Sequence, residues 1–305
     1  MGDILPIEER IAEASARWPG LQFRKTGNEV HSPCPRCGGN DRFIIWQHGR
    51  FLCRQCDFAG WLVDDRETPL TEAEKLELRV RSLEAKQAEH ECRLSALEKI
   101  HGMMHVAEFY HQNLADVNND AFEYWLDAGM EIETIGKHLL GYCSRCPTDS
   151  QRRDSYTIPV IIRDKLYNIR HRIRNAEDGD KYRPEIAGLP AVLFNADYLY
   201  TEDTDRIVVC EGEKKSLILE QSGFANVGLM GKSGFKAEWA GKFARFQTVF
   251  VALDPDAEAQ AAEIARLFKG RGRLVLLPGK LDDLLTQYGA TVEDIEWFLK
   301  RARRV

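Results

Sequence analysis

The chain has 305 residues, of which 44% are hydrophobic, and this composition suits several globular domains and argues against a disordered protein. A formal net charge of -6 excludes a uniformly basic nucleic-acid-binding protein, so any contact with phosphates must come from local basic patches. The sequence has neither a long apolar run nor a basic-then-apolar N-terminus, and we therefore expect a cytoplasmic protein without a membrane partner.

The first predicted element is a pair of cysteine turns. Cys34, Cys37, Cys53 and Cys56 follow the pattern C-x2-C-x15-C-x2-C, which in a reducing compartment favours metal ligation over disulfides. Four thiolates around one tetrahedral ion are typical of structural Zn²⁺. The segments RFIIWQ and RFLC between the turns predict two strands, so a small β zinc ribbon is expected over residues 1–65.

Cations and aromatic side chains surround this predicted ribbon, and such side chains suit phosphates and unstacked bases. They include Arg42, Trp46, His48 and Arg50. The alternative is that the zinc only replaces a core too small to fold alone. His31 is expected to be a neighbour of the zinc and not a ligand, and Cys143 and Cys146 form a further pair that is expected to be unligated.

Residues 66–102 are predicted to form a helical linker. From Thr71 onwards thirty residues contain no Gly or Pro, and Thr71 opens the capping-box pattern T-x-x-E. A helix of that length spans about 45 Å at 1.5 Å per residue. Apolar residues keep a spacing of three and four that Gln87 and His90 interrupt, so a strut is favoured over a coiled-coil dimer contact.

Residues 103–204 mix helical and strand-like stretches, an α+β pattern. Within residues 151–183, nine Lys or Arg stand against five Asp or Glu. Arg170, Arg172 and Arg174 alternate, so on a strand they would share one face and form a row of guanidinium groups suited to phosphates. The alternative is an edge strand that its charge protects from pairing with other chains.

Residues 205–305 alternate short apolar runs with helical stretches, which predicts a parallel sheet covered by helices. Ligands of such sheets bind at the carboxyl ends of the strands, where this sequence places acids. In chain order they are Glu211, Asp254, Asp256, Asp282 and Asp283. Gathered carboxylates need cations, so a divalent-metal site is expected. The alternative is that acids such as Asp256 and Asp282 cap helices.

The segment GLMGKSG, residues 228–234, resembles a phosphate loop only in part. Position 226 is Asn where that loop requires its first glycine. We therefore expect a glycine-rich turn from a strand to a helix beside the acidic site, with Lys232 and Ser233 as phosphate contacts.

In this order the pieces resemble the DnaG-type primases of bacteria and their phages. The four-cysteine ribbon is similar to that of bacteriophage primase-helicases, and YWLDAGMEIETIGKHLLGYC with YTIPVIIRDKLYNIRHRIR is similar to the family's basic subdomain. EGEKK and LDPDAEAQ are similar to the glutamate and D-x-D motifs of a TOPRIM domain. The order of these motifs after a zinc ribbon makes the resemblance specific.

The resemblance implies an α/β chain of four parts. They are a zinc-ribbon template-recognition domain (1–65), a helical linker (66–102), the basic N-terminal subdomain of an RNA polymerase domain (103–204), and a TOPRIM catalytic subdomain with a central parallel sheet flanked by helices plus a C-terminal helix (205–305). The implied activity is that of a DNA primase, which joins ribonucleoside triphosphates into short RNA primers on single-stranded DNA by two-metal nucleotidyl transfer.

By the same resemblance, Glu211, Asp254 and Asp256 would be catalytic and, with Asp283, would bind Mg²⁺ or Mn²⁺. Nucleotide and template would contact Arg170, Arg172, Lys181, Lys215, Lys232 and Ser233. The ribbon would recognise the template start site through Arg42, Trp46, His48 and Arg50. Lys215 departs from the family pattern, because many relatives carry a third acid there.

No phosphate-loop helicase segment follows, so a separate replicative helicase is the expected partner, in a bacterial cell or a phage-infected host. Two other functions stay open. The same acids could serve a TOPRIM-type nuclease if water were the nucleophile, or the chain could be a DNA-binding replication or regulatory module without catalysis.

Overall fold

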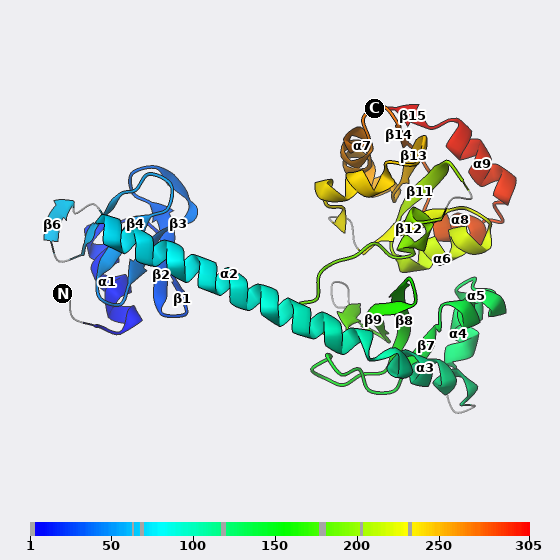
Figure 1. Ribbon diagram of the computed structural model, residues 1–305, viewed down its shortest axis with the longest axis horizontal. Coiled ribbons are helices and arrows are strands. Elements are labelled where there is room, and N and C mark those ends of the chain that lie inside the picture. The colour runs from blue at the N-terminus through cyan, green and yellow to red at the C-terminus, as the bar shows by residue number, and fades with distance from the viewer. Residues whose placement is uncertain are drawn as a thin grey trace. The chain divides into compact units, whose positions relative to one another are not determined.

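The computed structural model describes residues 4–62, 64–67, 70–116, 120–176, 181–201, 204–230 and 234–305, with 64–67 described by their backbone alone. It divides into two compact units, Met1–Glu89 and His90–Val305, whose elements are labelled in Figure 1. Within the described residues, no helix is long and apolar enough to cross a bilayer.

The first unit is an antiparallel sheet with helix α1 (Ile7–Arg17) against it. Its strands are hydrogen-bonded in chain order: β1 (Arg24–Thr26), β2 (Glu29–Cys34), β3 (Gly38–Trp46), β4 (Arg50–Cys53), β5 (Ala59–Trp61) and β6 (Asp64–Glu67). Phe43 and Phe51 are fully buried, and the ring of Trp18 meets both edge-on at 5.0 and 5.2 Å. The predicted ribbon is confirmed, with a core made largely of aromatic rings.

Helix α2 (Glu72–His101) is the predicted linker helix. Its capping box is present, because Thr71 Oγ1 accepts from the Glu74 backbone N–H at 3.2 Å while the Glu74 carboxylate accepts from the Thr71 N–H at 2.8 Å. Every residue from 79 to 95 is exposed. This part of the helix therefore buries no side chain in a core.

The second unit begins with helices and an antiparallel sheet. The helices are α3 (Met104–Gln112), η1 (Asn113–Ala115), α4 (Ala121–Asp127) and α5 (Ile132–Lys137). The sheet has the order β10-β9-β8-β7, formed by β7 (Gly141–Cys143), β8 (Ser155–Ile162), β9 (Lys165–Ile173) and β10 (Tyr182–Pro184). Ile158 and Val160 of β8 share one core with Trp125 of α4 and Leu217 of α6, which joins this sheet to the next part of the unit.

The last part is the predicted parallel sheet. Its order is β12-β11-β13-β14-β15, made of β11 (Arg206–Glu211), β12 (Asn226–Leu229), β13 (Thr248–Ala252), β14 (Gly272–Leu274) and the antiparallel edge strand β15 (Arg303–Arg304). The connections are η2 (Ala196–Leu199), α6 (Glu213–Gln221), η4 (Ala237–Phe243), η5 (Pro255–Ala257), α7 (Glu258–Leu267), α8 (Leu281–Thr286) and α9 (Val292–Lys300).

Helices cover both faces of this sheet (Figure 1). Val209 packs in one core with Ile264 of α7, whereas its neighbour Cys210 packs in the other with Leu281 of α8 and Ile295 of α9. Successive side chains of a strand point to opposite faces, so both faces need apolar residues. The predicted fold class is confirmed, and one local difference is that the segment predicted as a helix around Trp239 forms a 3₁₀-helix that contains Gly241.

Candidate active site and zinc centre

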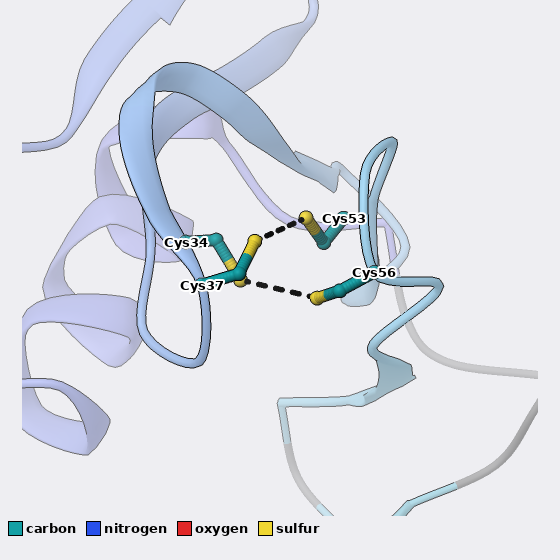
Figure 2. Close-up of side chains that lie close together, drawn as sticks. All are labelled: Cys34, Cys37, Cys53 and Cys56. Carbon is teal, nitrogen blue, oxygen red and sulfur yellow. Dashed lines mark hydrogen bonds between the residues drawn. The ribbon is translucent and has the colours of Figure 1, made fainter.

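The four cysteines of the ribbon converge on one point. Cys34 and Cys37 flank the turn between β2 and β3, and Cys53 and Cys56 flank the turn after β4. Figure 2 shows their side chains facing one another, with Sγ–Sγ distances of 3.8 Å for Cys34–Cys56 and 3.6 Å for Cys37–Cys53. All four sulfurs lie within 4.8 Å of one another. A tetrahedron with Zn–S bonds of about 2.3 Å has edges of about 3.8 Å, so the thiols fit Zn²⁺.

Backbone N–H groups support this cluster, as Arg36 N donates to Cys34 Sγ at 3.3 Å and Gln55 N donates to Cys53 Sγ at 3.4 Å. Burial raises the pKa of Cys53, but hydrogen bonds from backbone N–H groups and nearby thiols outweigh it and hold the pKa at about 7. Such donors favour the thiolate at Cys53, whereas burial raises the pKa of Cys34 and of Cys37. His31 lies outside this cluster, and its Nε2 is 3.0 Å from Glu29 Oε2.

Three of the four predicted recognition residues of the ribbon line one pocket of about 740 Å³, which the first turns of α2 also line. The Trp46 and His48 rings stack at 6.0 Å, and Trp61 meets His48 edge-on at 5.6 Å. Arg50 is only 3% exposed, and its guanidinium lies over Trp61 and 3.4 Å from Glu74. Arg42 stands in the middle of β3, where its side chain lies beside Cys37, and does not line this pocket.

The predicted arginine row is present on one face of the sheet at β9. Residues of β9 alternate between buried and half-buried, with Arg170 and Arg172 on the open face together with Arg174 just beyond the strand. Each guanidinium lies over a tyrosine ring, at 5.3 to 5.6 Å from the ring centroid. The pairs are Arg170–Tyr182, Arg172–Tyr124 and Arg174–Tyr156. Tyr124 and Tyr156 stack in turn at 3.4 Å, so the cations are held in fixed places.

Glu211 is the last residue of β11 and Asp254 follows β13, and these parallel strands are adjacent because they pair through Cys210 and Ala252. Asp254 is 7% exposed and occupies the N-cap position of η5, but its side chain makes no capping hydrogen bond. The carboxylate bonds instead to Lys215 of α6, whose Nζ lies 2.9 Å from Oδ1 and 3.0 Å from Oδ2. Capping therefore does not explain Asp254.

Glycines allow this acidic edge to be compact. Gly212 connects β11 to α6 with a φ of +86°, and its N–H donates to Leu229 O of β12 at 2.7 Å. A Cβ at Gly228 would lie 2.7 Å from Gly212 O. The first turn of α6, which carries Lys215, can approach β12 this closely only because position 228 has no side chain.

Three cations of the chain balance these acids. Lys215 also lies 3.8 Å from Asp282, Lys214 lies 3.6 Å from Asp282, and Arg170 lies 3.0 Å from Glu213. Burial lowers the pKa of Lys215, but its hydrogen bond with Asp254 and the charges of the nearby acids, including Glu211, raise it above its ordinary value. Arg170 and Lys215 also lie near Tyr182. Burial and the charge of Glu213 raise the pKa of this tyrosine. The acidic edge and the arginine row therefore adjoin.

The donor set fits a divalent cation in chemistry, since Oδ1 of Asp254 and Oδ1 of Asp282 are buried without a hydrogen bond. The carboxylate oxygens are, however, farther apart than the sulfurs of the zinc centre. Across the described ranges, the four cysteines are the only group of three or more ligand side chains whose donor atoms lie within 4.8 Å of one another. Lys215 occupies the space beside Asp254.

The other predicted site residues lie as follows. Asp256 is exposed in η5, and Lys181 is exposed just before β10. Asp283 accepts from Gln287 at 3.2 Å within α8, whereas its neighbour Asp282 faces the lysines. Lys232 and Ser233 lie outside the described residues. The metal-binding and nucleotide-binding roles of all these side chains stay predictions.

The third cysteine pair belongs to a buried polar network. Ser155 Oγ lies 2.9 Å from His171 Nδ1, and Glu185 Oε2 lies 2.7 Å from His171 Nε2. Burial lowers the pKa of His171, but contacts with Cys143, Cys146 and Glu185 raise it to about 11. In the described structure these donors surround the imidazole, and their ligand atoms do not form a group within 4.8 Å of one another. That the pair is unligated stays a prediction.

Sequence reasoning missed the tyrosines under the arginines, Glu213 as the partner of Arg170, and the direction of Asp282. Only Glu213 carried a signal, because it lies inside EGEKK next to the acid that was singled out. The tyrosines come from α4, β8 and β10, and no spacing along the chain marks them as partners of β9.

Comparison with known proteins agrees with this arrangement. Residues 29–61 match the zinc-binding domain of primase-helicase. A sequence search of curated proteins finds no match. Among solved structures, the zinc-binding and RNA polymerase domains of the Aquifex aeolicus primase match with a TM-score of 0.55 and 17% identity, covering 100% of this chain and 86% of that one.

Two further structures match over about 70% of the chain. The DnaG primase catalytic domain bound to single-stranded DNA has a TM-score of 0.55 and 19% identity over 70% of this chain and 83% of that one. The RNA polymerase domain of Mycobacterium tuberculosis DnaG has a TM-score of 0.56 and 14% identity over 69% and 84%. Residues 29–61 are thus similar to the zinc-binding domain of primase-helicase, and the chain has the fold of the zinc-binding and RNA polymerase domains of the primases that it matches.

Proposed function

We propose that this protein is a DNA primase that makes short RNA primers on single-stranded DNA. The observation that carries the proposal is the buried carboxylate of Asp254, at a strand end beside Glu211, on an edge that adjoins a fixed row of arginines. Carboxylates with adjacent guanidinium groups suit a reaction in which negative phosphates meet divalent ions. The shared fold with DnaG primases agrees with this reaction class.

In the proposed reaction the 3′ hydroxyl of the growing primer gives its proton to water, its oxygen forms a bond to the α-phosphorus of a ribonucleoside triphosphate, and pyrophosphate leaves with the electrons of the broken P–O bond. Mg²⁺ or Mn²⁺, when bound by Glu211, Asp254 and Asp256, would supply charge stabilisation to the attacking and leaving oxygens. Asp283 is a fourth proposed ligand. Its neighbour Asp282 is connected to Asp254, because both carboxylates pair with Lys215. Arg170 and Arg172, with Lys181, would hold phosphates of template and nucleotide.

The ribbon would supply recognition of the template start. Its pocket offers the faces of Trp46, His48 and Trp61 and the guanidinium of Arg50, which together suit an unstacked base and its phosphate. We propose a structural Zn²⁺ at the four cysteines and single-stranded DNA and ribonucleoside triphosphates as binding partners. A separate helicase stays a prediction.

Incubation with labelled single-stranded DNA, four ribonucleotides and Mg²⁺ or Mn²⁺ tests this function. We expect RNA products in the wild-type protein and a loss of at least about 100-fold in Asp254→Asn, because removing a metal-binding charge removes transition-state stabilisation. Asp256→Asn is expected to lose synthesis as well. Glu238→Gln is the control, since Glu238 is exposed in η4 of the same unit.

Unchanged synthesis by folded Asp254→Asn protein would contradict the assigned site. Metal-dependent shortening of the DNA would favour a nuclease instead, and DNA binding without any change in DNA or RNA length would favour a module without catalysis.

A further inference from the structure

Lys215 is a cation built into the acidic edge. Its ammonium lies 2.9 Å from Asp254 Oδ1 and 3.8 Å from Asp282 Oδ1, and its side chain is 12% exposed. The two acids come from different parts of the chain, after β13 and at the start of α8, and Lys215 comes from the first turn of α6. One ammonium therefore connects three separate elements.

The contacts of Lys215 fall on the oxygens that a divalent ion would use. Asp254 Oδ1 and Asp282 Oδ1 are both buried and accept no hydrogen bond, so the nearby ammonium is the positive charge that faces them. A divalent ion bound to the same oxygens would be repelled by an ammonium a few ångströms away in a half-buried setting. The affinity of carboxylate sites for divalent ions also falls as their net negative charge falls.

The neighbouring cations do not duplicate this position. Lys214 reaches Asp282 Oδ2 at 3.6 Å but has no recorded contact with Asp254, and Arg170 is bonded to Glu213. Among the residues that the structure describes, Lys215 is the one whose ammonium forms ion pairs with both Asp254 and Asp282.

We infer that Lys215 is a positioning residue that holds Asp254 and Asp282 in place as an internal cation and thereby weakens divalent-ion binding at this edge. The inference rests on the proposed function only in taking these carboxylates as an ion site. As a consequence, Lys215 supplies part of the positive charge that a second metal ion would provide in the proposed reaction. The acidic edge should therefore bind fewer divalent ions, or bind them more weakly.

Mn²⁺ titration followed by electron paramagnetic resonance tests the inference without any activity measurement. We would use the zinc-loaded full chain as wild type, Lys215→Met, Asp254→Asn and the double variant. Lys215→Met is expected to bind Mn²⁺ at least about tenfold more tightly than wild type, because one positive charge is removed next to the ligands. The double variant is expected to lose this gain.

Two controls distinguish the charge of Lys215 from its packing and from the general effect of removing any lysine. Lys215→Arg keeps the charge and is expected to bind Mn²⁺ as weakly as wild type, while Lys242→Met removes an exposed lysine of η4 and is expected to change nothing. Thermal unfolding midpoints show whether each variant folds, and Lys215→Gln replaces Lys215→Met if the latter does not.

The outcomes distinguish the inference from the proposed function. Equal Mn²⁺ affinity in wild type and in the neutral variants, with weaker binding in Asp254→Asn, would overturn the role of Lys215 and leave the ion site in place. Tighter binding in Lys215→Arg would overturn it too. Binding that does not respond to Asp254→Asn in any background would contradict the ion site itself and, with it, the inference.

Discussion

The arginines of β9 show how packing against a neighbouring side chain can prepare a charged group for ligand binding. A guanidinium that lies over a tyrosine ring keeps its charge while it loses much of its freedom before any ligand arrives. Arg172 also donates a hydrogen bond to the Tyr124 hydroxyl. Binding a phosphate at such a site costs less conformational entropy than ordering a free side chain.

We therefore expect Arg172→Ala to weaken binding of single-stranded DNA and to make it less sensitive to salt. Each phosphate contact on a single strand contributes about 0.7 to the slope of log affinity against log salt concentration, so the slope should fall by about that amount. Fluorescence anisotropy of a labelled oligonucleotide from low to moderate salt measures it. Arg266→Ala, on the exposed side of α7, is the matched control. An unchanged slope with unchanged affinity would exclude Arg172 from the binding surface.

At this scale the sequence predicted Glu211, Asp254 and the arginine row correctly in position, because strand periodicity alone determines which face a residue takes. The sequence could not show whether Asp282 or Asp283 faces the acidic edge. Successive helical residues differ by about 100° in direction, so the start of α8 decides which acid faces the lysines. That start depends on packing of Leu281 against the sheet.

Among the elements, the zinc ribbon is the one whose stability depends most on a metal. Its sheet is held by one aromatic cluster and α1, a small core for a unit with six short strands. Zinc binding to the four thiolates would therefore contribute directly to its folding.

Cys34→Ser should release zinc and unfold the ribbon, while the separate core of the second unit stays folded. On natural templates, primer initiation is expected to fall at least about tenfold, whereas extension of a supplied primer should change little, because the acids and arginines lie in the second unit. Zinc content by colorimetric release and the two activities measured in parallel test this. Cys92→Ser, on the exposed part of α2, is the control. Equal losses of initiation and extension would count against template recognition by the ribbon.

The elements themselves were largely predictable. The capping box at Thr71, the alternation of β9 and the buried runs of β11 and β13 are local patterns, and each produced the expected element. The 3₁₀ form of η4 was not predictable, because Trp239 and Phe243 both enter the core and the demands of that core override the local preference for an α-helix.

For the whole molecule, Glu220 connects α6 with the end of α5 and with Asn195 inside the second unit. This residue of α6 lies 2.5 Å from Lys137 Nζ and 2.7 Å from His138 Nε2 at the end of α5, and it accepts from Asn195 at 3.0 Å. Its side chain is 9% exposed. Burial raises its pKa, but the hydrogen bonds and charges of His138 and Lys137 outweigh burial and hold the pKa below the ordinary value of 4.5.

Glu220→Gln should lower the free energy of unfolding by about 1 to 2 kcal/mol at neutral pH, a modest value because Lys137 is largely exposed. A folded pKa below the unfolded one means that the stabilisation is complete above about pH 4.5 and is lost as the pH falls through the folded pKa. Urea unfolding at several pH values measures it, with Glu263→Gln on α7 as the exposed control. A difference from wild type that persists unchanged in acid would contradict this assignment.

Helix α2 has a consequence for how such a molecule can change over time. From residue 79 to residue 95 its side chains are exposed, so substitutions there are free of the packing constraints that govern a core. Under the proposed function, a recombination event within this stretch would exchange one start-site-recognising ribbon for another and leave the acids and arginines of the second unit unchanged. Priming preference and priming catalysis could then be inherited separately.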